Sequence, residues 1–366
     1  MSLKAGIVGL PNVGKSTLFN AITNSKVESE NYPFATIAPN VGVVEVPDER
    51  LYQLSAIFNP KKTIPTTFEF TDIAGLVKGA SQGEGLGNQF LSHIREVDAI
   101  VHVVRCFDHD QIVHVEGTVD PIRDIEIIEL ELGLSDLQTI DNRISRVQRK
   151  AKANDKESLF ELALLIKLKE IIEKGLPVST IDLNDQEIKV ISGFHLLTAK
   201  PVIYVANMDI DHVSNPEQND YFIKVQTYAN TRKAQVIPVC AKVEEEISEL
   251  DKKNKQELLH ELSIIHSGLD QIIVSTYQLL NLSTFFTCGE KEVRAWTFTK
   301  GSKAPKCAGI IHTDFEKGFI RVEAYTFFDI MKYQSEVALK EAGKLRVEGK
   351  NYEVLDGDVL HFRFNV

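Results

Sequence analysis

The sequence has 366 residues, which is enough for about two or three domains, and 43% of them are hydrophobic, so a core can form. No apolar run reaches the roughly 18 residues of a transmembrane helix, and the start of the chain lacks the pattern of a signal peptide. The net charge of −11 argues against bulk DNA binding. Four scattered cysteines without a CxxC pair predict neither a disulfide nor a zinc site, and they fit a reducing cytoplasm.

The first strong signal follows a short apolar strand, Leu3 to Val8. The next residues, Gly-Leu-Pro-Asn-Val-Gly-Lys-Ser from Gly9 to Ser16, match the pattern GxxxxGK[ST], and a helix is predicted from Thr17 to Thr23. Such a loop turns its backbone N–H groups and the positive end of a helix toward phosphates, while its Lys neutralises charge and its Ser coordinates Mg²⁺. We therefore predict a site for a Mg-bound nucleoside triphosphate at Asn12, Val13, Gly14, Lys15, Ser16 and Thr17, with Lys15 also catalytic.

Two further residues complete the predicted magnesium site. Asp72 ends the strand from Thr67, and the stretch Asp72-Ile-Ala-Gly75 has the DxxG spacing that places a carboxylate near Mg²⁺ and a backbone N–H, that of Gly75, near the γ-phosphate. Thr36 lies between the two motifs, where its hydroxyl suits the same metal; the alternative is a surface-loop threonine. Ser16, Thr36 and Asp72 are thus the expected metal ligands.

The strands of the nucleotide domain continue after this motif. Ala99 to Val104, Pro201 to Ala206 and Val236 to Val239 are short apolar runs separated by helical segments, which indicates a mostly parallel sheet with helices on both faces. Between Leu134 and Lys174 the chain has neither Gly nor Pro, and its apolar residues recur at helical spacing. We predict two antiparallel helices there, with the tip at residues 153–155.

The base-binding loops follow the last two of these strands. A guanine-reading loop has the pattern Asn-Lys-x-Asp, but here Asn207 is followed by Met208, Asp209 and Ile210, so the guanine-reading carboxylate is out of register. Without that partner a purine site loses most of its reason to reject adenine, so we expect ATP to bind at least as well as GTP. Asn207, Met208, Cys240, Ala241 and Lys242 are the expected contacts of these loops, together with Phe107.

The C-terminal part has a different pattern of predicted elements. Short strands at Val293 to Thr299, Gly318 to Ala324 and Asp356 to Phe364 predict a small mixed domain. From Leu279 onward, 13 Lys and Arg face 12 Asp and Glu, so the acidic charge lies in the rest of the chain. Trp296 and Phe298 alternate on one strand beside three lysines, which indicates either core residues or an RNA-stacking surface.

Several long strings resemble the YchF/Obg-like ATPase family of the Obg group, and the resemblance covers essentially the whole chain. They include residues 9–17, 32–37, 72–77, 83–88, 292–297, 312–320 and 357–365. The resemblance implies a cytosolic, bacterial-type member with a P-loop α/β nucleotidase domain (1–130 and 200–277), an inserted antiparallel, coiled-coil-like helical arm (131–199) and a C-terminal α+β TGS domain (278–366). It also implies ATP hydrolysis in preference to GTP, and association with ribosomes.

Hydrolysis needs a group that places the attacking water. Relatives often use a Gln after DxxG, but Leu76 stands there and cannot form a hydrogen bond. The resemblance implies His114 as the catalytic substitute, whereas the plain alternative is a structural histidine. Asn12 resembles an asparagine that holds K⁺ beside the phosphates in some relatives; the alternative is a turn-forming Asn. Activation by a partner that orders the glycine-rich stretch 79–87 is a third route.

A second candidate partner surface lies on the arm, and three candidate functions follow from the sequence. Arg143, Arg146, Arg149, Lys150 and Lys152 lie on the first helix of the arm, as an RNA contact or as a plain solvated face. The sequence favours a ribosome-linked ATPase that needs Mg²⁺, with K⁺ as a candidate second cofactor, and that has no membrane partner. A non-catalytic, nucleotide-gated adaptor is the alternative, and a GTP-specific GTPase is disfavoured by Met208 and Ile210.

Overall fold

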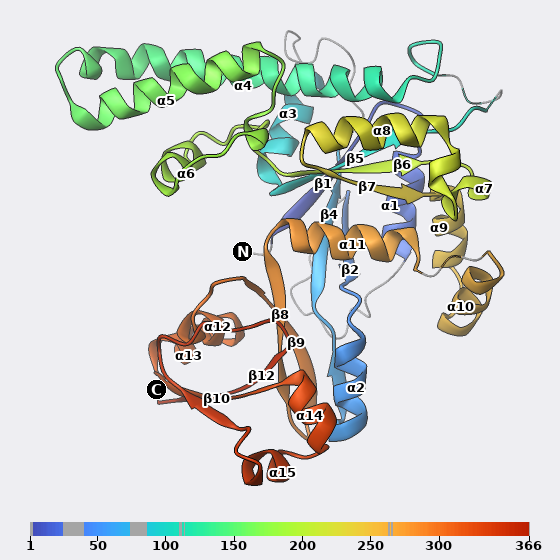
Figure 1. Ribbon diagram of the computed structural model, residues 1–366, viewed down its shortest axis with the longest axis vertical. Coiled ribbons are helices and arrows are strands. Elements are labelled where there is room, and N and C mark those ends of the chain that lie inside the picture. Colours follow the sequence, from blue (N-terminus) through green and yellow to red (C-terminus); the bar gives the residue numbers. More distant parts are fainter. Residues whose placement is uncertain are drawn as a thin grey trace. The chain divides into compact units, whose positions relative to one another are not determined.

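The chain forms two compact units, each with its own six-stranded sheet. The computed structural model describes residues 3–24, 40–73, 86–109, 112, 114–262, 264 and 266–365 (Figure 1). Within that part, the first unit holds residues 3–24, 40–43 and the stretch from Glu69 to Ile272, and the second holds residues 44–68 and the stretch from Ile273 onward. No helix of the described residues is long and apolar enough to cross a membrane.

The first unit is built on a sheet with the strand order β2-β4-β1-β5-β6-β7. Its strands are β1 (Lys4–Val8), β2 (Val41–Glu45), β4 (Thr67–Asp72), β5 (Ala99–Arg105), β6 (Val202–Asn207) and β7 (Gln235–Val239). All neighbouring pairs from β4 to β7 run parallel, which confirms the predicted mostly parallel sheet. Every residue of β5 is buried, as expected for a parallel strand that is covered on both faces.

Helices pack on both faces of this sheet, as Figure 1 shows. The helices of this unit are α1 (Lys15–Asn24), α3 (Leu86–Glu96), α7 (Ile210–Val213), α8 (Asp220–Thr231), α9 (Ala241–Ser248) and α10 (Lys252–Glu261), and α11 (Gly268–Leu279) begins in it. On one face α8 and the beginning of α4 (Pro121–Ala151) form a core with β5 and β6, while α1 packs against α9. The loops at the carboxyl ends of the parallel strands therefore meet along one edge, where ligands of such sheets bind.

The inserted arm consists of α4 and α5 (Lys156–Glu173), which confirms the predicted helix pair and its tip. Asp120 caps α4 and Asp155 caps α5, since each side chain accepts hydrogen bonds from backbone N–H groups of the first turn. Leu164, Leu165 and Leu168 of α5 form the arm's core with Ile140 of α4. A short helix, α6 (Asp185–Ser192), begins with a capping box at Asn184.

Helix α4 is one continuous helix that belongs to two cores. Near its start Ile125 is buried with the sheet, whereas farther along Ile140 is buried with α5. Three side chains of α4 hold the part between the two cores. Glu129 accepts hydrogen bonds from Tyr204, Tyr228 and Arg232, and Ser135 accepts one from Arg95. Asp136 accepts three hydrogen bonds, from the backbone N–H groups of Leu197 and Thr198 and from the Thr198 hydroxyl. The base of the arm is therefore fixed to the rest of the first unit by these hydrogen bonds.

The second unit is an α+β fold with the strand order β11-β10-β12-β8-β9-β3. Its strands are β3 (Lys62–Ile64), β8 (Leu282–Cys288), β9 (Glu292–Thr299), β10 (Phe319–Thr326), β11 (Arg346–Glu348) and β12 (Asp358–Phe364), and its helices are α2 (Glu49–Phe58), α12 (Ala304–Ile311), α13 (Thr313–Lys317), α14 (Phe327–Tyr333) and α15 (Glu336–Glu341). Two cores lie on it: α12 covers one, and α2, α14 and α15 cover the other.

One segment of the second unit comes from far earlier in the chain. β3 pairs in parallel with β9, and Leu51 and Leu54 of α2 pack beside Phe286. Residues 44–68 thus fold with the C-terminal part, and the expected domain bounds of 1–130, 131–199, 200–277 and 278–366 stay a prediction about functional domains. Phe298 is buried in the core, and Trp296 stacks near Phe285 and donates its indole N–H to Thr287, which favours the core interpretation.

Candidate nucleotide-binding site

The phosphate loop lies between β1 and α1, as the motif predicts. Two of its residues, Asn12 with a φ of 63° and Gly14 with a φ of 94°, adopt left-handed backbone conformations, which turn the chain sharply into the helix. A Cβ atom on Gly14 would lie 2.2 Å from the Asn207 side-chain nitrogen, so only glycine fits there. Lys15 and Ser16 are the first two residues of α1, at the helix end that attracts phosphates.

Lys15 and Asp72 face each other across the end of the sheet. The Lys15 Nζ is 4.0 Å from Oδ1 of Asp72, and the two side chains are 10% and 21% exposed. That same Asp72 Oδ1 is buried and has no hydrogen-bond partner. A buried carboxylate oxygen without a hydrogen bond is costly unless a closely bound cation or water satisfies it, so the residues fit a hydrated Mg²⁺ beside Ser16.

Two of the expected site residues, Thr36 and Gly75, lie outside the described residues, as do Leu76 and the glycine-rich stretch up to residue 85. The predicted metal ligands Ser16 and Asp72 follow neighbouring strands β1 and β4, whose register pairs Ile7 with Asp72. Both residues thus lie at the carboxyl ends of neighbouring parallel strands, a placement that agrees with a shared metal ion.

Asn207 connects the base-binding loops to the phosphate loop. Its side-chain Nδ2 donates to the Val13 carbonyl at 2.8 Å, and its Oδ1 accepts from the Ala241 N–H at 3.0 Å. The side chain is buried, so neither bond is exposed to competing water. Asn207 therefore holds three loops in one arrangement.

The other residues of the base loops divide into buried and exposed ones. The Met208 side chain is buried in the core between the sheet and α8, and its N–H donates to the Val239 carbonyl at 2.8 Å. Cys240 and Ala241 are buried at the start of α9, while Lys242 is exposed. Asp209 and Asp211 begin α7 and are exposed, so the carboxylates of this loop lie at a helix start.

The loop after β5 is organised by Arg105, a residue that sequence reasoning did not single out. Its guanidinium is buried and donates to the carbonyls of Phe107 at 3.1 Å and Ile112 at 3.0 Å, and it stacks over the Phe107 ring at 4.7 Å. Asn219 of α8 donates to the Cys106 carbonyl. A lone arginine at the end of an apolar strand is the signal that could have indicated this role, because such a charge needs partners.

His114 lies in the same loop and is buried, with its side chain 4% exposed. Its Nε2 is 2.8 Å from Oδ2 of Asp124, and its Nδ1 accepts a hydrogen bond from the Glu116 N–H at 3.1 Å. Burial raises the pKa of Asp124, against the opposing effects of His114 and Arg123. Asp124 was not predicted either, since an acidic residue in the first turn of a helix is commonplace.

The four cysteines are all free and buried. Burial raises the pKa of each thiol, so little thiolate is present at neutral pH.

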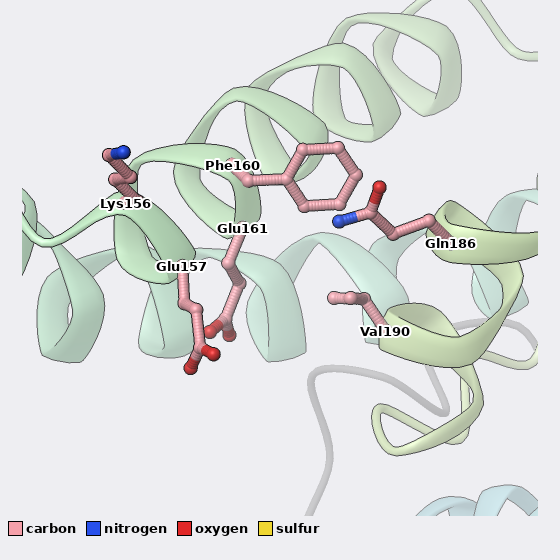
Figure 2. Close-up of a pocket in the computed structure, with 6 residues that line it drawn as sticks. All are labelled: Lys156, Glu157, Phe160, Glu161, Gln186 and Val190. Atoms are coloured by element: carbon pink, nitrogen blue, oxygen red, sulfur yellow. The ribbon is translucent and has the colours of Figure 1, made fainter.

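The predicted partner surface on the arm is exposed. Arg143, Arg146, Arg149, Lys150 and Lys152 all reach solvent, and Arg143 pairs with Glu161 of α5. A hollow of about 380 Å³ lies nearby, between α5 and α6. Figure 2 shows the side chains that line it, which are Phe160, Val190, Gln186, Lys156 and the carboxylates of Glu157 and Glu161. Those two carboxylates disfavour a phosphate in the hollow, so an RNA contact on the arm would use the α4 face instead.

A parallel sheet, a phosphate loop and a facing Asp72 define a P-loop nucleoside triphosphatase. Known proteins agree: residues 4–154 match the family model of 50S ribosome-binding GTPases, and residues 282–365 match that of the YchF-GTPase C-terminal region, described only as a protein of unknown function.

Full-length relatives narrow the class to one family. The chain is 59% identical to the ribosome-binding ATPase YchF of Bacillus subtilis and 53% identical to that of Escherichia coli O157:H7, each over 100% of both chains. The solved structure of the Schizosaccharomyces pombe YchF GTPase is similar with a TM-score of 0.89 and 42% identity, over 99% of this chain and 98% of that one. The chain therefore belongs to the YchF family.

Proposed function

We propose that this protein is a Mg²⁺-dependent ATPase that prefers ATP to GTP and acts as a ribosome-associated switch in the cytoplasm. The observation that carries the proposal is the site at the sheet edge, where the phosphate loop, Lys15 and Asp72 meet the base loops through Asn207. The relatives named as ribosome-binding ATPases, at 53–59% identity over the full length, support the same function.

The preference for ATP rests on the loop after β6. Asn207 is fixed by two hydrogen bonds and Met208 is buried, while the position that would carry the guanine-reading carboxylate is Ile210. A guanine would therefore lack the partner for its edge, and a missing partner changes discrimination strongly. Cys240, Ala241 and Lys242 line the other side of the proposed base site, and Phe107 lies in the loop held by Arg105.

Bound Mg²⁺, held by Ser16, Thr36 and Asp72, would neutralise charge on the β- and γ-phosphates. Lys15 binds the same phosphates, the backbone of Asn12 to Thr17 encloses them, and Gly75 donates its N–H to the γ-phosphate. His114 is the group that we propose to orient or deprotonate the attacking water, because Leu76 cannot. Its present hydrogen bonds mean that the surrounding loop has to rearrange first.

A monovalent cation is a second proposed contribution. Asn12 adopts a left-handed conformation in the phosphate loop, where its side chain would hold K⁺ beside the phosphates. Turnover should then be faster in K⁺ than in Na⁺ at equal ionic strength. Equal rates in the two salts would remove K⁺ from the mechanism.

Titration of ATP, GTP and their diphosphates, with Mg²⁺ and K⁺ present, tests the ligand part of the proposal. We expect ATP to bind at least as tightly as GTP. A tenfold or greater preference for GTP would contradict our interpretation of Met208 and Ile210.

The ribosome contact is proposed to use the exposed basic face of α4. Replacing Arg146, Arg149 and Lys150 by Glu should weaken co-sedimentation with ribosomes, and binding of the wild type should weaken as salt rises. Reversal of three exposed acidic residues of the same arm, Glu157, Glu170 and Glu173, by Lys is the matched control, and it should not weaken binding. If the basic-face variant still co-sedimented fully, the contact would lie elsewhere.

A non-catalytic adaptor is the second candidate, because one observation favours it. Both ring nitrogens of His114 are occupied, so the residue proposed for hydrolysis is not poised to react. In an adaptor, ATP binding alone would set the state of the arm and the C-terminal unit. Single-turnover hydrolysis with and without ribosomes separates the two functions, since an adaptor shows no stimulated turnover.

A further inference from the structure

The hydrogen bonds of His114 determine its tautomer. A neutral imidazole has one N–H and one lone pair. The Glu116 backbone N–H can only donate, so Nδ1 of His114 carries the lone pair and Nε2 carries the proton that Asp124 accepts. With the lone pair in use and the ring buried, His114 cannot accept a proton from water in this arrangement.

Asp124 is itself held firmly. Its second oxygen, Oδ1, accepts a hydrogen bond from Arg123 at 3.2 Å, and Arg123 also donates to the carbonyl and the hydroxyl of Thr118. Farther along the same helix, Glu129 and Asp136 fasten α4 to the sheet and to the loop after α6. The carboxylate is therefore a fixed point, and any rearrangement must take place in the loop of His114.

The loop has separate anchors on its two sides. Before His114, Arg105 holds the carbonyls of Phe107 and Ile112, and that contact does not involve α4. The His114 side chain is fastened to α4 through Asp124, and its other bond, to Glu116, lies within its own loop. Opening one hydrogen bond thus frees the ring while the start of the loop stays in place.

We propose that Asp124 is a positioning residue that holds His114 in a buried, non-reactive state, and that ATP hydrolysis requires this hydrogen bond to open. The inference rests on the proposed role of His114 in hydrolysis. It would give a physical reason for the slow basal turnover and the activation by a partner that we expect: whatever favours the open loop would raise the rate without touching the phosphate loop. A carboxylate that instead orients His114 for catalysis, as in a catalytic triad, would have the opposite effect when removed.

The test is single-turnover ATP hydrolysis by the full chain carrying Asp124→Ala, Asp124→Asn, His114→Ala or the double change Asp124→Ala with His114→Ala. We expect Asp124→Ala to raise the basal rate about 3- to 10-fold, because a buried His114 N–H without a partner favours the open loop. Asp124→Asn should raise it less, since the amide oxygen still accepts a weaker hydrogen bond. The double variant should return to the rate of His114→Ala.

Glu126→Ala is the control, because Glu126 is an exposed carboxylate on the same helix, and its rate should match the wild type. A fall in rate, or no change, in an Asp124→Ala or Asp124→Asn protein that still binds ATP would overturn the proposal. If Asp124→Ala does not fold, as judged by thermal unfolding, Asp124→Asn decides alone.

A second readout separates this inference from the proposed function. Long-range ¹H–¹⁵N spectra of the histidine side chains report the tautomer of His114 directly. The wild type should show His114 with its proton on Nε2, and Asp124→Ala should lose that preference. If His114→Ala hydrolysed ATP at the wild-type rate, the catalytic role would fail, whereas an unchanged tautomer in Asp124→Ala would refute the positioning role itself.

Discussion

The two sides of the nucleotide site differ in how ready they are for chemistry. On the phosphate side, Gly14 and Asn207 fix the loop, and an Asp72 oxygen without a hydrogen bond faces Lys15. On the hydrolysis side, the loop after β5 is equally well bonded, but its hydrogen bonds occupy the one group that would react, His114. If His114 acts in hydrolysis as proposed, binding and hydrolysis of ATP are therefore under separate control.

The largest expected effect lies on the hydrolysis side. Replacing His114 by Ala should slow ATP hydrolysis about 10- to 100-fold, which is at or below the lower end of the contribution typical of an acid–base group. ATP affinity should stay the same, because His114 contacts neither the phosphate loop nor Asn207. Single-turnover rates and equilibrium titration of the same samples measure the two effects. Unchanged turnover would remove His114 from the mechanism and would favour the adaptor.

On the phosphate side, Asn207→Ala should show the reverse pattern. The change leaves the Val13 carbonyl and the Ala241 N–H without their buried partner, which lowers the free energy of unfolding by about 1–3 kcal/mol. We expect ATP to bind about tenfold more weakly, because the phosphate loop loses its support. Denaturant unfolding and ATP titration measure these changes. Normal ATP affinity in a destabilised variant would mean that the loop keeps its shape without Asn207.

The smallest effect concerns the choice of base. Ile210→Asp places a carboxylate where a guanine-reading loop has one, at the first position of α7, where an acidic residue is well tolerated. The ratio of GTP to ATP affinity should rise by about tenfold or less. Ile210→Asn is the control without the charge, and its ratio should change less. If Ile210→Asp left the ratio unaltered, another residue would set the base preference.

Much of the first unit could be predicted because its signals are local. Every strand of its sheet except β2, the phosphate loop and the helix pair of the arm follow from short patterns, and the observed strand bounds differ by at most one residue from those expected. Helix α4 is the exception, since it begins at Pro121, where it still packs on the sheet. The resemblance to the YchF family was confirmed over the whole chain.

Other features depend on contacts between distant parts of the chain. The pairing of β3 with β9 joins residues near position 63 to residues near 293, and no local pattern specifies it. The partners of His114 were hidden for a similar reason: the motif places a histidine in a loop, but only the fold shows that Asp124 and the Glu116 N–H use both of its nitrogens. Arg105 gave a local signal, because an arginine ending an apolar strand needs acceptors.

Single-turnover hydrolysis of ATP by the wild type and by His114→Ala, each with and without ribosomes and at saturating ATP, tests the separation of binding from hydrolysis most directly. We predict slow basal turnover of the wild type, faster turnover with ribosomes, and loss of most of this stimulation in His114→Ala at equal ATP occupancy. Equal rates of the two proteins in both conditions, or an ATP occupancy that falls together with the rate, would contradict the account.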